Sequence, residues 1–197
     1  VDFEFMGEFV QPRIKEFGTF ADPDIGKVVS EVGECSNQSL VSHLGSMGVD
    51  FEKGHYLFSG GGASSFKLWV ENGSAKQLEG NRASGSFLWH PDIGRVKGGY
   101  EPIMTYLACF PYGLKILGEG RIPGLDCTTA MPTYEAYTHI KSSIGQDAVS
   151  EAISDGLVEV IDAKPATMYR LPPWALHRGP TEDERSGPRL WMRRFRP

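Results

Sequence analysis

A histidine and an aspartate two residues apart, His90 and Asp92, form the one His-x-Asp motif of this 197-residue chain. In an extended segment the side chains of residues i and i+2 project to the same side, so this imidazole and this carboxylate can bind one cation together. His177, at the end of a later strand-like stretch, is the candidate for a third ligand. Two histidines and one carboxylate on one face, with the opposite coordination positions open, are the ligand set of non-heme Fe(II) oxygenases. These three residues are therefore the predicted metal-binding and catalytic residues.

With these residues in this order, the chain resembles the Fe(II)- and 2-oxoglutarate-dependent dioxygenase superfamily. That superfamily carries its His-x-Asp motif near the second strand of a double-stranded β-helix and a distal histidine on the seventh strand. The resemblance covers residues 66–195. It implies Fe(II) and 2-oxoglutarate as cofactors and O₂ as a co-reactant. An aspartate in the second ligand position implies hydroxylation and not halogenation, because a halide needs that position vacant.

The resemblance also assigns residues to the cosubstrate. Arg189 lies twelve positions after His177 and resembles the arginine that binds the far carboxylate of 2-oxoglutarate. A guanidinium offers a planar fork of donors that fits a carboxylate. Arg193 and Arg194, on the same stretch, are alternative anchors. Tyr106, which follows the His-x-Asp motif on the next strand, resembles the polar residue that helps to hold 2-oxoglutarate.

The same residues also have purely structural interpretations. Asp92 can cap the turn 91–94. His177 can be a structural histidine bonded to a loop carbonyl. The C-terminal arginines can pair with Glu182 or Glu184, and such pairs contribute little when they are exposed. A His-x-Asp motif does not decide between these interpretations, because it arises by chance in about one of four chains with five histidines.

The segment around His177 indicates how that histidine is positioned. Residues 168–171 alternate in the pattern of a half-buried strand, and Pro172-Pro173 ends it because proline donates no backbone hydrogen bond. The apolar residues that follow place His177 on a rigid corner. After the polar loop 181–187, the chain alternates again from Arg189, which predicts a second strand with its arginines on one face.

The remaining elements are short and separated by glycine and proline. Residues 1–21 predict an extended edge strand, and helices are expected after the Asp22-Pro23-Asp24 start signal and after Ser36. Apolar periodicity predicts a late helix over 137–153, weakened by Gly145, and residues 121–135 are expected to form a loop. Further strands are predicted at 66–70, 86–90, 103–110, 114–117 and 157–161.

This order of elements predicts an α+β, mainly β fold. Short helices followed by seven or eight strands with Gly/Pro corners are typical of a jelly-roll or cupin-like barrel, which is the double-stranded β-helix of the resemblance. The mouth of such a barrel holds one small ligand. We expect a single domain over residues 1–197, with 1–65 as helical and extended support and 66–197 as the β-barrel core.

Composition limits the function classes. A formal net charge of −5 argues against a duplex-DNA binder that neutralises many phosphates, although the C-terminal arginines form a local basic cluster. The cysteines Cys35, Cys109 and Cys127 form no C-x-x-C pair, which favours a reducing cytoplasm over a zinc or disulfide framework. No apolar run reaches membrane-spanning length, so no membrane partner is expected.

The expected function is a dioxygenase that hydroxylates a small-molecule substrate, a metabolite or a nucleobase. Aromatic residues near the proposed barrel mouth suit a flat or apolar substrate, or else belong to the core: Trp89, Tyr100, Tyr112, Trp174 and Trp191. Two alternatives remain open. One is a metal-dependent cupin enzyme that uses no 2-oxoglutarate, and the other is a non-catalytic cupin-like module whose arginines bind an anionic ligand.

Overall fold

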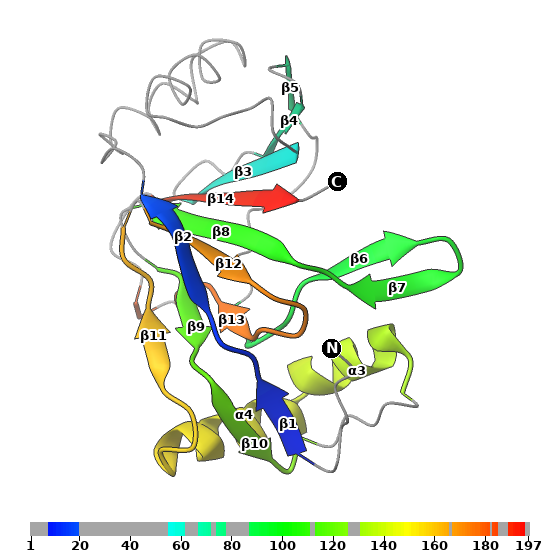
Figure 1. Ribbon diagram of the computed structural model, residues 1–197, viewed down its shortest axis with the longest axis vertical. Coiled ribbons are helices and arrows are strands. Elements are labelled where there is room, and N and C mark those ends of the chain that lie inside the picture. The colour runs from blue at the N-terminus through cyan, green and yellow to red at the C-terminus, as the bar shows by residue number, and fades with distance from the viewer. Residues whose placement is uncertain are drawn as a thin grey trace.

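The structure is a computed structural model, and the residues that it describes are 8–19, 55–61, 67–71, 74–77, 87–110, 113–125, 131–165, 167–181, 183–184 and 189–195. The two helices expected between residues 22 and 48 lie outside this part of the chain, as do Cys35, Tyr112 and Cys127. The described residues are rich in antiparallel strands and contain two helices (Figure 1).

The largest layer is a seven-stranded sheet. Its neighbouring strands are, in order, β2 (Lys15–Thr19), β12 (Thr167–Leu171), β8 (Thr105–Phe110), β14 (Arg189–Phe195), β3 (His55–Gly61), β4 (Lys67–Glu71) and β5 (Ser74–Gln77). β14 therefore lies between β8 and β3, so the last described strand is central to the sheet and not at its edge.

A three-stranded sheet supplies the second layer. It runs in the order β11 (Val160–Asp162), β9 (Lys115–Leu117) and β13 (His177–Arg178). Buried side chains of both sheets form one cluster, in which Leu107 of β8 and Tyr169 of β12 share a core with Ile116 of β9. The two sheets therefore pack face to face, with an apolar interior between them.

A second core lies under two helices. Strands β1 (Glu8–Gln11) and β10 (Gly120–Pro123) pair with one another, and helices α3 (Thr133–Lys141) and α4 (Ser143–Ser154) pack near them. The cluster beneath these elements contains Phe9, Ile122, Ile140 and Val149. The helical layer thus covers one end of the strand assembly (Figure 1).

A hairpin projects from the body of the molecule. Strands β6 (Ile93–Val96) and β7 (Gly99–Pro102) pair with each other, and the hairpin extends away from both sheets (Figure 1). Its base is closed by a hydrogen bond of 3.2 Å from the Ile103 N–H to the Asp92 carbonyl. The hairpin therefore begins immediately after the predicted ligand Asp92.

The sequence predicted several of these elements but not β3, β5, β6 and β7, and three of its expectations are corrected by the structure. The expected strand 86–90 is not one, because 87–89 have no ladder and His90 makes only an isolated bridge. The expected loop 121–135 contains most of β10, which the pairing with β1 holds extended, and the start of α3.

The third correction concerns the late helix, which is two helices. Ser142 lies between them in an extended conformation, and its hydroxyl accepts the Gly145 N–H. A Cβ on Gly145 would stand 2.4 Å from the Ile140 carbonyl oxygen, so only glycine allows α4 to approach the end of α3 this closely. The residue that weakens a continuous helix is therefore the one that permits the corner.

The observed class is α+β and mainly β, as predicted, and the described residues form no closed barrel. The single-domain assignment stays a prediction. None of the helices in the described part of the chain is long and apolar enough to cross a membrane.

Candidate metal centre

The predicted ligands His90 and His177 are direct partners across two antiparallel segments. The His90 N–H donates to the His177 carbonyl and the His177 N–H donates to the His90 carbonyl, both at 3.1 Å. Residues that exchange both backbone hydrogen bonds in this way carry their side chains on the same face. The two imidazoles accordingly lie together, with ring centroids 4.6 Å apart.

Backbone carbonyls fix the orientation of both rings. Nδ1 of His90 lies 2.8 Å from the Leu88 carbonyl oxygen, and Nδ1 of His177 lies 3.3 Å from that of Ala175. A carbonyl only accepts, so each Nδ1 carries the proton and each Nε2 keeps its lone pair. Nε2 of His177 is buried and has no hydrogen-bond partner in the part of the chain that the structure describes. A buried nitrogen of this kind calls for an explanation, and a cation ligand supplies one.

The carboxylate of Asp92 completes the group and is itself held on both oxygens. Thr105 donates its hydroxyl to Oδ2 over 2.8 Å, and Arg193 donates from Nη2 to Oδ1 over 2.8 Å. Oδ2 also lies 3.7 Å from Nε2 of His177. Ligating carboxylates are normally hydrogen-bonded in this manner, which fixes their direction.

Electrostatics set the protonation states that a cation requires. Burial, reinforced by the neighbouring His177, lowers the pKa of His90 from 6.5 to about 3. Burial also lowers the pKa of His177. For Asp92, burial opposes ionisation, but the charge of Arg193, aided by the Thr105 hydrogen bond, outweighs it and lowers the pKa of the carboxyl. At neutral pH the site therefore holds two neutral imidazoles and one carboxylate, so a metal ion need not displace a proton.

The donor set fits a divalent transition-metal ion. One atom from each of His90, Asp92 and His177 lies within 4.8 Å of the others, and all three residues are buried. Small rotations of the side chains bring such atoms to the ~2 Å bonding distance of one ion. Two imidazole nitrogens with one carboxylate oxygen suit Fe(II), Mn(II) or Zn(II) better than the all-oxygen cations Mg²⁺ and Ca²⁺.

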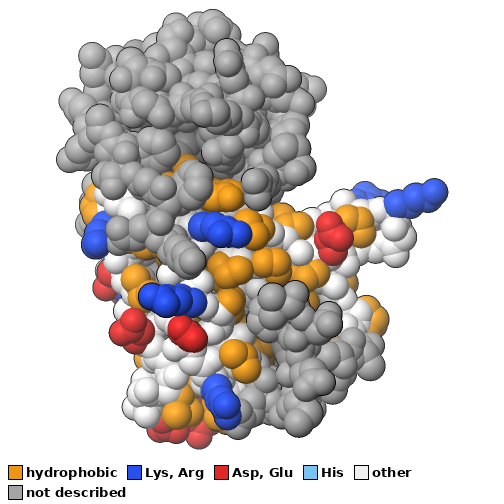
Figure 2. All heavy atoms as spheres, viewed as in Figure 1, with side chains coloured by type: hydrophobic (Ala, Val, Ile, Leu, Met, Phe, Trp, Pro, Cys, Tyr) orange, Lys and Arg blue, Asp and Glu red, His pale blue; other side chains and the backbone are white. Residues whose placement is uncertain are grey.

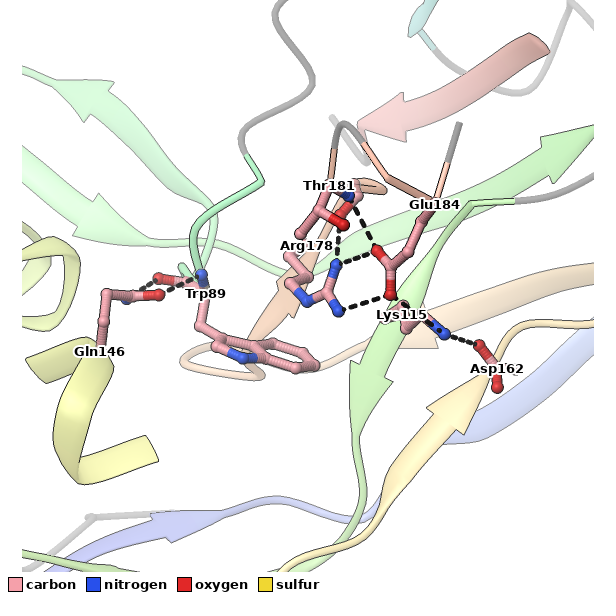
Figure 3. A network of polar contacts seen from close by, with 8 residues as sticks. Trp89, Lys115, Gln146, Asp162, Arg178, Thr181 and Glu184 are labelled. Atoms are coloured by element: carbon pink, nitrogen blue, oxygen red, sulfur yellow. Dashed lines mark hydrogen bonds and ion pairs between the residues drawn. The ribbon is translucent and has the colours of Figure 1, made fainter. Parts of the chain in front are cut away.

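Residues adjacent to the two histidines form a second interaction, made by Trp89 and Arg178. The guanidinium carbon of Arg178 lies 5.2 Å from the centre of the Trp89 ring. Glu184 holds the other side of the guanidinium with two hydrogen bonds, of 2.6 and 3.0 Å (Figure 3). Lys115 bridges Glu184 to Asp162 beyond it. The two ligand-bearing segments are thus joined by their backbones and by this cation–π contact.

Helix α4 holds the backbone of the first segment through Gln146. The Trp89 N–H donates to Oε1 of Gln146 over 2.9 Å, and Nε2 of Gln146 donates to the Trp89 carbonyl over 3.0 Å (Figure 3). The same Nε2 donates to the Ile140 carbonyl over 2.8 Å. The amide therefore takes the place of a neighbouring strand beside Trp89, where no ladder continues.

The second segment is positioned by the predicted proline corner. The Ala175 N–H donates to the Pro172 carbonyl over 3.1 Å, and Trp174 has φ of 68°. Trp174 occupies the third position of this four-residue turn, and a positive φ at that position is normally found with glycine. The indole meets Phe9 edge to face, with ring centres 6.3 Å apart, so packing compensates for the unfavourable backbone.

The structure brings Arg193 to the group, and the predicted contacts of Arg189 and Tyr106 with a cosubstrate stay predictions. Arg189 begins β14, paired with Gly61, and its side chain lies outside the described part; the side chain of Arg194 does too. The hydroxyl of Tyr106 lies 3.9 Å from the sulfur of Met104. Because Thr105 faces Asp92, strand alternation directs Tyr106 to the opposite face of β8. A contact between Tyr106 and a cosubstrate stays a prediction.

Sequence reasoning missed four residues that hold the site: Thr105, Trp89 as a cation–π partner, Arg178 and Gln146. The sequence could have indicated Trp89 and Arg178, because each is next to a predicted ligand. It could not have indicated Gln146, since its contacts depend on the break between α3 and α4.

No protein-family model, no curated protein and no solved structure matches this chain. The chemistry of the centre is therefore inferred from its own residues.

Proposed function

We propose that the chain is a non-heme Fe(II)- and 2-oxoglutarate-dependent dioxygenase that hydroxylates a small metabolite or a nucleobase. One observation carries the proposal: among the described residues, the buried Nε2 of His177 has no hydrogen-bond partner, and it lies in a group that also contains His90 and Asp92. When bound there, Fe(II) with 2-oxoglutarate supplies the oxidising chemistry. Overall, 2-oxoglutarate and O₂ are consumed, succinate and CO₂ are released, and the substrate gains a hydroxyl group.

The chain's own residues have distinct parts in this proposal. His90, Asp92 and His177 hold the ion, and three ligands leave further coordination positions for a bidentate 2-oxoacid and O₂. Arg193 is engaged by the Asp92 carboxylate, so Arg189 on the same strand remains our proposed anchor for the far carboxylate of 2-oxoglutarate. The two facing sheets support a double-stranded β-helix as the finer description of the fold.

A specific observation favours a second candidate, a binding module without metal. Arg193 already neutralises Asp92 at 2.8 Å, and a guanidinium beside a ligand carboxylate repels a cation. In that alternative the three residues form a buried polar group and the arginines bind an anion.

The deciding experiment is metal loading. Purified chain is equilibrated anaerobically with Fe(II), passed over a desalting column and assayed for bound iron. We expect one ion per wild-type chain and almost none in His177→Ala. His139→Ala, which removes a histidine of α3 outside the centre, is the matched control and keeps its iron. Equal iron content in wild type and His177→Ala would exclude the metal centre.

Loaded protein then separates the enzyme classes. Titration with 2-oxoglutarate under argon should produce a metal-to-ligand absorption band, and Arg189→Ala should require a higher concentration to reach it. Arg121→Ala, which removes an exposed arginine of β10, serves as the control. Iron binding without the band, and without succinate on admission of O₂, would favour a cupin enzyme that uses no 2-oxoglutarate.

A further inference from the structure

The projecting β6–β7 hairpin is joined to the metal centre at its base. Asp92 is the residue before β6, and its carbonyl accepts the Ile103 N–H just after β7. The residues of the hairpin tip are exposed, and the side chains at its far end include those of lysine and arginine (Figure 2). At ~3.3 Å per residue, Arg95 lies about 10 Å along the strand from Asp92. A ligand that reaches the candidate metal centre and also contacts Arg95 must therefore be longer than a small metabolite.

Three tyrosines form a continuous strip from this hairpin to helix α3. Tyr100 of β7 stacks on Tyr134 with ring centres 5.1 Å apart, and Tyr134 stacks on Tyr137 with centres 6.3 Å apart. Tyr100 is 42% exposed and Tyr134 is 51% exposed. Aromatic rings exposed side by side are unusual on a surface that only meets water, and they offer stacking faces to a ligand.

Positive charges lie at both ends of this tyrosine strip, and the acidic Glu135 follows Tyr134 in the first turn of α3. Arg95 is the cross-strand partner of Tyr100 and so shares its face of the hairpin. At the other end, Nζ of Lys141 lies 5.0 Å from the centre of the Tyr137 ring. The acidic residue of the hairpin, Glu101, pairs with Gly94 and therefore faces the other way.

We propose that the tyrosine strip binds single-stranded nucleic acid. Bases stack on the parts of the Tyr100 and Tyr134 rings that their neighbours leave exposed, and phosphates pair with Arg95 and Lys141. A strand held in this way presents a base to the centre at Asp92, which makes nucleic acid the substrate class; this second statement rests on the proposed function. A duplex is disfavoured because its bases expose no stacking face and because the chain carries a net charge of −5.

Single-stranded nucleic acid fits the tyrosine strip better than a proline-rich peptide does, although such peptides also dock on aromatic side chains. Such peptides lie in grooves between separated rings. Here the rings are stacked on one another at interplanar angles of 29° and 28°, and both ends of the strip carry a cation. Stacked rings with flanking cations match alternating bases and phosphates.

The test uses the 197-residue chain treated with a chelator, so that binding is measured without metal. The probe is a fluorescein-labelled thymidine oligonucleotide of about twelve nucleotides, followed by fluorescence anisotropy. We expect saturable binding that is at least about ten-fold weaker in Tyr134→Ala and little changed in Tyr134→Phe, which keeps the ring. Arg95→Gln should lower the salt dependence of the dissociation constant, whereas Arg121→Gln, an exposed arginine on β10, should not.

Three results would contradict the binding of nucleic acid by the tyrosine strip. They are no binding of the oligonucleotide, equal binding by wild type and Tyr134→Ala, and tighter binding of a labelled proline-rich peptide. Failure here is separable from failure of the proposed function. If the protein binds the oligonucleotide but takes up no iron, the oxygenase proposal is refuted and nucleic-acid binding by the tyrosine strip is supported. If it takes up iron but does not bind the oligonucleotide, only nucleic-acid binding by the strip is refuted.

Discussion

Arg193 and Asp92 form an ion pair of 2.8 Å within a candidate metal centre, with the carboxylate buried and the guanidinium partly exposed, so an arginine occupies the neighbourhood that a divalent cation would share. The pair lowers the pKa of the carboxyl and keeps it ionised in an apolar interior. The same positive charge opposes the binding of a cation. The pair therefore satisfies the carboxylate without an ion and would lower the affinity of the group for one.

Replacing Arg193 with methionine tests this competition. The substitution leaves the Asp92 carboxylate buried without its cation, so we expect a loss of about 3–5 kcal/mol in the free energy of unfolding. Mn(II) should restore more stability in Arg193→Met than it adds to wild type, because the ion replaces the missing charge. Thermal unfolding with and without Mn(II) measures both effects. An equal rise in melting temperature for the two proteins would contradict the competition.

Gln146 should support the site from a distance. Gln146→Leu leaves the Trp89 N–H and carbonyl unpaired, and we expect a loss of about 1–3 kcal/mol in unfolding free energy. Metal affinity should fall by about ten-fold, because the segment that carries His90 loses its lateral support. Denaturant titration and metal titration provide the two readings. Ser150→Ala, one turn further along α4, is the control and should change neither.

Trp174 allows the backbone strain of the proline corner to be measured. At φ of 68°, alanine is strained and glycine is not, so Trp174→Gly should be more stable than Trp174→Ala by about 1 kcal/mol. Both variants lose the contact with Phe9, which therefore cancels in the comparison. Equilibrium unfolding in urea gives the difference. An alanine variant as stable as the glycine variant would show that the corner relaxes when the indole is removed.

Glu184 should contribute stability that depends on pH. The hydrogen bonds from Arg178 hold the pKa of this carboxyl well below its ordinary value of 4.5. A lowered pKa means that the contribution is complete above pH 4.5 and declines as the pH falls toward the pKa of the folded state. We expect Glu184→Gln to lose up to about 1 kcal/mol at pH 7 and less at pH 3, since the side chain is a third exposed. A difference that does not change with pH would point to packing instead of charge.

Local pattern was sufficient to predict β12 and β14 from alternating apolar residues, and β8 from a near-continuous apolar run. It also predicted the three candidate ligands, whose meeting the structure bears out. Residues 87–89 were wrongly predicted to be a strand, because their apolar pattern does not come from pairing in a sheet. Trp89 packs in the core and against Arg178, and its backbone bonds to Gln146 in place of a strand.

The choice among the C-terminal arginines depended on information that spacing does not contain. Arg189 and Arg193 lie on one strand, and only the pairing of β14 with β8 brings Arg193 beside Thr105 and Asp92. Tyr106 was assigned by resemblance to a polar residue that helps to hold 2-oxoglutarate, and the face on which a strand residue lies changes with a register shift of one residue. Register is a property of the assembled sheet.

His90 and His177 form an isolated bridge that is not part of a long ladder. The backbones of the two ligand-bearing segments are therefore joined there by two hydrogen bonds. If that edge frays, the imidazoles separate and a bound ion loses half of its nitrogen donors at once. The rate at which an ion escapes should therefore follow local breathing of this edge, and amide exchange at residues 90 and 177 should slow when the ion is present.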